Sequence, residues 1–185
     1  MLLLGCKPAD RYTEQHDVFF AIGTSLKELV PQINIAWPEA KGNIHIDAWR
    51  EITSVDGYDV SVSEKTPRIS TPGAPALFFL NLGGYKPGEF EEFHYKMIVA
   101  AANESEAIQL AKQTAFYKHT GFKGAASHID DKYSVDVDDV YALASILPPA
   151  CKGKYTIMLT RQKTMATEDE FHLGYLQLWK IKDGD

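Results

Sequence analysis

The sequence has few cysteines, no long apolar run and no excess of basic residues, and each shortage excludes a class of protein. Only two cysteines occur in 185 residues, so a disulfide-stabilised scaffold is not expected, and this usage suits a reducing cytoplasm. No apolar stretch approaches the roughly 18 residues of a membrane-spanning helix. The formal net charge of −6 disfavours a broad nucleic-acid-binding face. We therefore expect a cytoplasmic protein with no nucleic-acid and no membrane partner.

Motifs for nucleophilic catalysis and phosphate binding are also missing from the sequence. There is no Gly-x-Ser-x-Gly, and no glycine-rich stretch ends in the Gly-Lys-Ser/Thr of a phosphate-binding loop. The run Leu3-Leu4-Gly5-Cys6 resembles a lipoprotein acylation site, but the apolar stretch is too short for a secretory signal and no basic residue precedes it. We expect a strand at Leu2 to Leu4 instead, and a buried rather than reactive Cys6.

The sequence does contain an internal repeat with a period of 78 residues. Three times, an apolar strand-like segment is followed by a polar loop and a second segment that begins near a histidine. The equivalent histidines are His16, His94 and His172. The third copy stops after this pair of strands, so the chain contains two full modules and part of a third.

A helix is expected after the second strand of each full module. Ser25 with Glu28, and Asn103 with Glu106, have the spacing of a capping box, in which each side chain bonds a backbone N–H at the start of a helix. In the first copy, Pro31 should kink or shorten the helix. In the second, apolar residues at helical spacing predict a helix from about residue 104 to 117.

Strand-like sequence returns after each helix. A tripeptide is repeated as His45-Ile46-Asp47 and His128-Ile129-Asp130. In the first copy, Asp56-Gly57 predicts a two-residue hairpin turn before the alternating segment that begins at Tyr58. In the second copy, alternation over residues 133–137 predicts one strand, and Asp138-Asp139 separates it from the next.

This order of elements predicts an α+β fold of duplicated β-β-α-β-β modules, with antiparallel sheets, one helix per module and a C-terminal β-hairpin. The first module spans residues 1–65 and the second spans 77–147, with a proline-rich linker at 66–76. The C-terminal hairpin, at 155–185, is the partial third repeat. We expect these parts to form one compact unit.

The repeated motifs are Leu82-Gly83-Gly84, Glu91 to His94, His45 to Asp47, His128 to Asp130 and Val55-Asp56-Gly57-Tyr58. They resemble those of an uncharacterised bacterial family, domain of unknown function 1543. The resemblance covers roughly residues 2–62 and 77–143. It implies a small cytoplasmic bacterial protein and brings no activity with it.

The repeated histidines and their neighbouring aspartates are the candidates for ligand binding. They are His16, His94, His45, Asp47, His128 and Asp130. Residues i and i+2 of a strand share a face, so a His-x-Asp pair can converge on a divalent metal. The interpretation that we favour is structural: each histidine bonds a hairpin backbone and closes its module.

A run of aspartates follows the second tripeptide, at positions 130, 131, 136, 138 and 139. Calcium and magnesium sites use such oxygens, but the glycine and glutamate of the calcium-binding loop are absent. A solvated strand edge protected by charge explains the run equally well.

No activity is assignable from these features. We expect a binding or interaction protein whose partner is a small molecule or another protein, and exposed sheet edges also allow a homodimer. The alternative is a metal-dependent hydrolase or isomerase that uses the repeated His and His-x-Asp residues. No cofactor is assignable on the first hypothesis, whereas the second requires a divalent metal. The distances between the repeated histidine and aspartate side chains distinguish the binding-protein hypothesis from the metal-dependent enzyme hypothesis.

Overall fold

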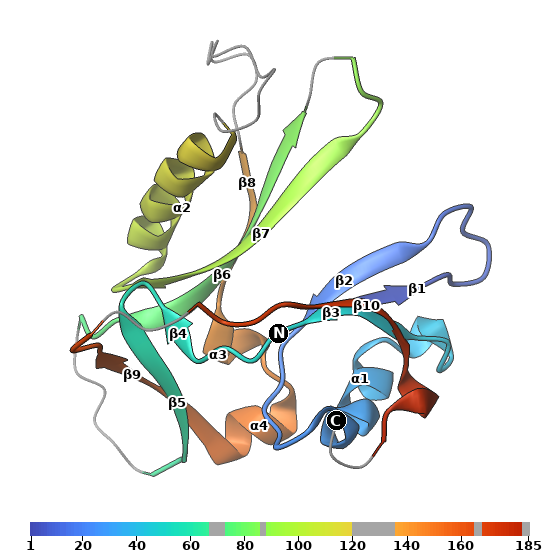
Figure 1. Ribbon diagram of the computed structural model, residues 1–185, viewed down its shortest axis with the longest axis horizontal. Coiled ribbons are helices and arrows are strands. Elements are labelled where there is room, and N and C mark those ends of the chain that lie inside the picture. Colours follow the sequence, from blue (N-terminus) through green and yellow to red (C-terminus); the bar gives the residue numbers. More distant parts are fainter. Residues whose placement is uncertain (67–72, 86–87, 120–135, 165–167, 183–185) are drawn as a thin grey trace. The chain divides into compact units, whose positions relative to one another are not determined.

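The computed structural model describes residues 1–66, 73–85, 88–119, 136–164 and 168–182 (Figure 1). The chain divides into two compact units, which we call unit 1 (Met1–Lys65 and Ile146–Asp185) and unit 2 (Thr66–Ser145). Each unit combines helices with antiparallel strands, which confirms the predicted α+β class. Within the described part of the chain, no helix is both long and apolar enough to cross a membrane.

The larger sheet of unit 1 has four antiparallel strands in the order β10-β3-β1-β2. The central strand β1 confirms the strand predicted at the N-terminus, and it includes a buried Cys6. A short 3-10 helix, η3 (Leu178–Lys180), follows the edge strand β10. The strands are β1 (Leu2–Cys6), β2 (Gln15–Phe19), β3 (His45–Trp49) and β10 (His172–Gln177).

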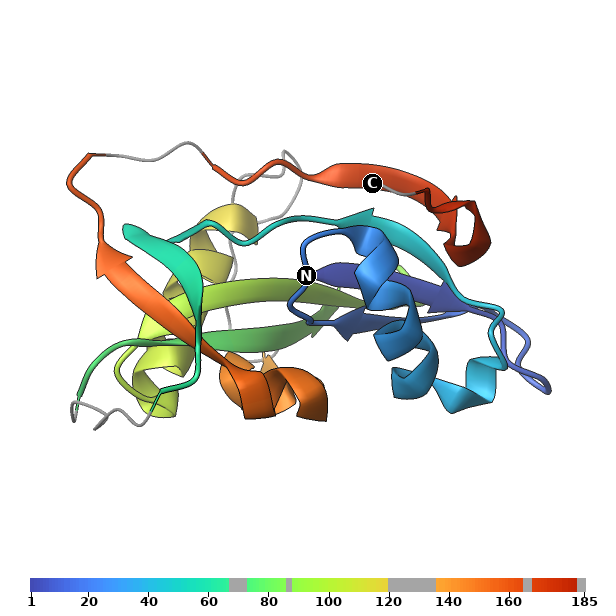
Figure 2. The same ribbon diagram turned by 90° about the horizontal axis from the view of Figure 1, so that it is seen from below.

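One face of this sheet is covered by α1 (Leu26–Ala36), which is followed by the 3-10 helix η1 (Pro38–Ala40) (Figure 2). Ile33 of α1 packs in the same core as Leu4 and Ile46, and Ile33 and Ile46 have no solvent exposure. Burying apolar side chains of this size contributes about 1.5–3 kcal/mol each. The residues that alternate with Leu4 and Ile46 therefore lie on the opposite face of the sheet.

The second sheet of unit 1 contains β4 (Ser54–Val55), β5 (Tyr58–Glu64) and β9 (Tyr155–Arg161). The turn between β4 and β5 confirms the predicted hairpin: Asp56 and Gly57 have φ angles of 48° and 78°, as a type I′ turn requires. The short helix α4 (Pro149–Lys154) leads into β9.

Unit 2 is a sheet in the order β7-β6-β8 with one long helix, α2 (Glu104–His119), along one face (Figure 1). Ala107 and Ala111 of the helix are fully buried in one core with Leu80 and Leu82 of the central strand. The strands are β6 (Ala76–Tyr85), β7 (Glu92–Ala101) and β8 (Asp136–Ala142), and α3 (Leu143–Ile146) follows β8.

Both predicted capping boxes are present. In α2, the Glu106 N–H donates to Asn103 Oδ1 at 3.0 Å, and a Glu106 carboxylate oxygen accepts from the Ala102 N–H at 2.7 Å. In α1, the Glu28 N–H donates to Ser25 Oγ at 3.4 Å. These bonds satisfy N–H groups that have no partner within the helix, so they define where each helix begins.

Three features differ from the expectations. The helix α1 continues through Pro31 to residue 36, so the proline does not shorten it. Asp138 and Asp139 lie inside β8 rather than between two strands, because a shift in register takes up the extra residue. The two C-terminal strands do not face one another as a hairpin, because β9 pairs with β5 while β10 pairs with β3.

The type I′ turn yields a prediction about stability. Gly57→Ala should lower the free energy of unfolding by about 1–2 kcal/mol, because a Cβ is unfavourable at positive φ. Crowding is not the cause, since the nearest atom to such a Cβ is 3.9 Å away. Chemical denaturation measures the change. Gly153→Ala, in α4 and with open space around it, is the control and should leave stability unchanged or higher.

Candidate metal centres

Four side chains converge on one face of the larger sheet of unit 1, and we call them the unit 1 cluster. Two are histidines and two are carboxylates: Glu14, His16, His45 and Asp47. His16 Nε2 lies 3.6 Å from a Glu14 oxygen and 3.3 Å from an Asp47 oxygen. His45 Nε2 lies 3.3 Å from each of the same two carboxylates. Each imidazole nitrogen thus lies near both carboxylates, and each carboxylate faces His16 with one oxygen and His45 with the other.

Strand pairing explains why the two histidines meet. Gly5 of the central strand β1 is opposite His16 on β2 and opposite His45 on β3. Directly opposed residues point to the same face of a sheet. The neighbouring Leu4 points into the core with α1, so the histidines lie on the face away from the helix.

A β-bulge places Asp47 beside them. Leu3 is opposite Ala48 and Leu4 is opposite Ile46, so Asp47 is the extra residue in β3. Bulges commonly turn a side chain toward a site. Here the Asp47 carboxylate is turned over Gly5, where a Cβ would lie 2.6 Å from its Oδ2 and would overlap His45 Nε2. Glycine is therefore the residue at position 5 that leaves room for the cluster.

His45 is the buried member of the unit 1 cluster. Its side chain is 6% exposed, whereas those of His16 and Glu14 are 43% and 44% exposed. Among the described residues, His45 Nε2 and Asp47 Oδ2 are buried and have no aligned hydrogen-bond partner. The Tyr175 ring of β10 packs against the His45 ring, with centroids 4.2 Å apart. The imidazole is thus held in place while its nitrogen points at carboxylates that it does not hydrogen-bond.

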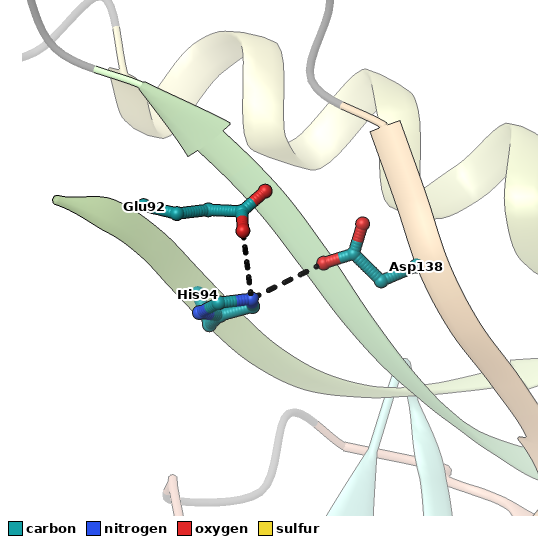
Figure 3. Close-up of side chains that lie close together, drawn as sticks. All are labelled: Glu92, His94 and Asp138. Atoms are coloured by element: carbon teal, nitrogen blue, oxygen red, sulfur yellow. Dashed lines mark ion pairs between the residues drawn. The ribbon is translucent and has the colours of Figure 1, made fainter.

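Unit 2 carries a related cluster on β7 and β8, the unit 2 cluster, made of Glu92, His94 and Asp138 (Figure 3). His94 Nε2 lies 3.4 Å from an Asp138 oxygen and 3.9 Å from a Glu92 oxygen. One ligand atom from each residue lies within 4.8 Å of the others, the spacing of atoms that share a metal ion. All three side chains are 31–40% exposed, so this cluster is more accessible to water than His45 is.

The two clusters occupy equivalent places in their sheets. Gly83 of the central strand is opposite His94, as Gly5 is opposite His16. Asp138 is the extra residue at a bulge in β8, as Asp47 is in β3. A Cβ on Gly83 would lie 2.5 Å from Asp138 Oδ2. Three residues of unit 2 follow their unit 1 counterparts by 78 positions: Gly83 after Gly5, Glu92 after Glu14 and His94 after His16.

The structure brings together some of the predicted residues. His16, His45 and Asp47 form one cluster, and His94 belongs to the other. His128 and Asp130 lie outside the described residues. The His172 ring stacks on Trp49, with ring centroids 3.9 Å apart.

Three ligand candidates were not among the predicted site residues: Glu14, Glu92 and Asp138. The repeat contained a signal for the first two, since Glu-x-His occurs at Glu14 to His16 and at Glu92 to His94. Residues at i and i+2 share a face of an extended chain, so each glutamate side chain points to the same side as the histidine side chain two residues later. The sequence marked Asp138 only as one of the run of aspartates between 130 and 139, and its place beside His94 depends on the bulge.

Comparisons with known proteins support the family resemblance and the fold. The model of the family "Domain of Unknown Function (DUF1543)" matches residues 11–62, which confirms the resemblance over that range. All four residues of the unit 1 cluster lie within it. Comparison with curated proteins gives no match.

A solved structure has a similar fold. The crystal structure of a protein Il1583 from Idiomarina loihiensis aligns with a TM-score of 0.60 and 20% sequence identity. The alignment covers 96% of this chain and 94% of that chain. At this identity, the similarity supports the fold and carries no activity.

The environment of Cys6 predicts an unreactive thiol. Burial raises the pKa of Cys6, and the Glu14 carboxylate adds to the increase. Because the thiolate is the reactive form, Cys6 should react slowly with a thiol reagent at neutral pH and faster only under more alkaline conditions. A colorimetric thiol assay on Cys151→Ser measures Cys6 alone, and the unfolded variant gives the full reference rate. Rapid labelling of the native variant at neutral pH would contradict the prediction.

Proposed function

We propose that unit 1 binds a divalent transition-metal ion through Glu14, His16, His45 and Asp47. The observation that carries the proposal is the state of the buried His45 Nε2. It lies 3.3 Å from oxygens of both Glu14 and Asp47, yet it makes no aligned hydrogen bond among the described residues. A cation bound between these atoms would satisfy the nitrogen and both carboxylates together.

The spacing of the ligand atoms supports this proposal. Zinc is bound by histidine nitrogen and carboxylate oxygen at about 2.0–2.2 Å, so neighbouring ligands of a tetrahedral site are about 3.4 Å apart. Each histidine nitrogen in the unit 1 cluster lies 3.3 or 3.6 Å from one oxygen of each carboxylate, and the two histidines face different oxygens of the same carboxylate. An ion between them would take one oxygen from each carboxylate. The two carboxylates also supply the two negative charges that neutralise a divalent ion.

A purely structural role for these histidines fits the contacts less well. A structural ion pair would align an imidazole N–H with a carboxylate, because that alignment provides most of the stabilisation. Leaving a buried polar atom without a partner costs about 1–3 kcal/mol. The cluster contains two such atoms, His45 Nε2 and Asp47 Oδ2.

The donor set indicates the class of metal. Two imidazole nitrogens and two carboxylate oxygens suit borderline ions such as Zn²⁺ or Co²⁺ better than Ca²⁺ or Mg²⁺, which prefer oxygen alone. Tyr175 and Gly5 would act as positioning residues. Tyr175 holds the ring of His45, and Gly5 leaves the space that the ring and the Asp47 carboxylate occupy.

Metal titration tests the proposal. Protein purified without a histidine tag should bind Zn²⁺ in calorimetry, and Co²⁺ should give the visible absorption of a four-coordinate site. His45→Ala should weaken binding about tenfold or more, since removing only an outer partner of a ligand already costs about 10–100-fold. Binding should also weaken on acidification, because protonated ligands cannot hold the ion.

Gly5→Ala tests the geometry without removing a ligand. Its Cβ would displace His45 and Asp47, so Zn²⁺ binding should weaken although all four ligands remain. Gly84→Ala is the matched control, since a Cβ there has no neighbour within 4 Å and binding should not change. Circular dichroism confirms that each variant is folded. Unchanged Zn²⁺ affinity in both His45→Ala and Gly5→Ala would refute the proposal.

Metal-dependent hydrolysis is a second candidate, favoured by the exposure of one side of the unit 1 cluster. Glu14 and His16 are nearly half exposed, so water could reach an ion bound there. A catalytic zinc needs such access to generate a bound hydroxide. Zinc-loaded protein should then hydrolyse activated esters or phosphates faster than His45→Ala does. Equal rates for the two would leave metal binding as the proposal and remove the hydrolase.

A further inference from the structure

We infer that unit 2 contains a second, independent cation site, formed by Glu92, His94 and Asp138, which prefers a harder ion than unit 1 does. Mn²⁺ is the probe that we choose for it. The inference does not require the unit 1 cluster to bind a metal, because every residue that it uses belongs to unit 2.

The first argument is the geometry of the three ligand atoms. They come from two strands of one sheet and lie within 4.8 Å of one another (Figure 3). Glu92 and His94 are two residues apart on β7, so both point to the face away from α2, and Asp138 approaches from β8. The side chains therefore converge on one point above the central strand.

The second argument is that the backbone arrangement of the unit 1 cluster is repeated. Each cluster has a glycine in the central strand, a histidine opposite that glycine and an aspartate at a bulge in the other neighbouring strand. In each, a Cβ on the glycine would lie about as close to an aspartate oxygen, at 2.6 Å in unit 1 and 2.5 Å in unit 2. An exposed ion pair by itself would need neither the bulge nor the glycine. The recurrence of all three features indicates a shared binding geometry.

The third argument concerns the choice of ion. The unit 1 cluster has two nitrogen donors, whereas the unit 2 cluster has one nitrogen and two carboxylates. At the register position of His45, opposite the glycine, β8 carries Asp136 rather than a histidine. Carboxylate and water ligands suit Mn²⁺ and Mg²⁺, and imidazole suits Zn²⁺. All three side chains of the unit 2 cluster are 31–40% exposed, whereas His45 of unit 1 is 6% exposed, so we expect bound water and a more labile site in unit 2.

The experiment is a Mn²⁺ titration of the full chain, followed by the loss of the electron paramagnetic resonance signal of free Mn²⁺. No Zn²⁺ is added, because a nitrogen–oxygen site binds Zn²⁺ more tightly than Mn²⁺ and any Zn²⁺ that unit 1 did not take up would occupy the unit 2 site. Wild-type protein should bind about one Mn²⁺. His94→Ala removes a ligand, and Gly83→Ala places a Cβ 2.5 Å from the position of Asp138 Oδ2. Each variant should therefore weaken Mn²⁺ binding about tenfold or more. Gly84→Ala, the next residue of the same strand, has open space for its Cβ and should bind as wild type does.

His45→Ala separates this inference from the proposed function. If the unit 2 site exists, Mn²⁺ binding in His45→Ala should match that of wild type, whatever happens to Zn²⁺. Equal Mn²⁺ affinity in wild type, His94→Ala and Gly83→Ala would overturn the inference, because the bound ions would then be distributed over other acidic groups. Loss of Zn²⁺ binding in His45→Ala with unchanged Mn²⁺ binding would support both sites.

Discussion

Both clusters depend on a missing Cβ in a central strand. Interior glycine weakens a strand by about 0.5–1 kcal/mol relative to alanine, so a glycine there calls for a reason. At Gly5 the reason is steric, because the ring of His45 and the carboxylate of Asp47 occupy the space where a Cβ would be. Gly83 is under the same constraint from Asp138. In each sheet, a small loss of strand stability permits a dense group of polar side chains on the outer face.

The alternation of a β-strand lets the same few residues build both the core and the cluster. In β1, Leu4 is buried with α1 on one face while Gly5 underlies the cluster on the other. In β3, Ile46 is fully buried between His45 and Asp47. The core therefore fixes the strands whose outward residues form the cluster. A shift of one residue in the register of these strands would move the core side chains to the outer face and the cluster side chains to the inner face, so both the core and the cluster would be lost.

Much of this arrangement was predictable from the 78-residue repeat. The repeat predicted the first two strands of each module, the capping boxes and the equivalence of His16 and His94, and the structure places both histidines opposite a glycine. The repeat could not predict which residue of unit 2 is equivalent to Asp47. The sequence pairs the His45 tripeptide with residues 128–130, 83 positions later, whereas the register of β8 makes Asp138 equivalent to Asp47. Asp138 follows Asp47 by 91 residues rather than 78, so this pair does not keep the period of the repeat.

The two strands of the third copy of the repeat do not pair with each other, unlike the corresponding strands of the first two copies. These two strands join different sheets of unit 1: β9 pairs with β5, and β10 pairs with β3, the strand that carries His45. Opposite Asp47, β10 has its own irregularity, where Gly174 has a φ of 135° and Tyr175 turns onto the His45 ring. This contact covers one side of an imidazole that would otherwise be open at the sheet edge. It accounts for the burial of His45 in the unit that the C-terminal strand joins, whereas all three side chains of the unit 2 cluster are 31–40% exposed.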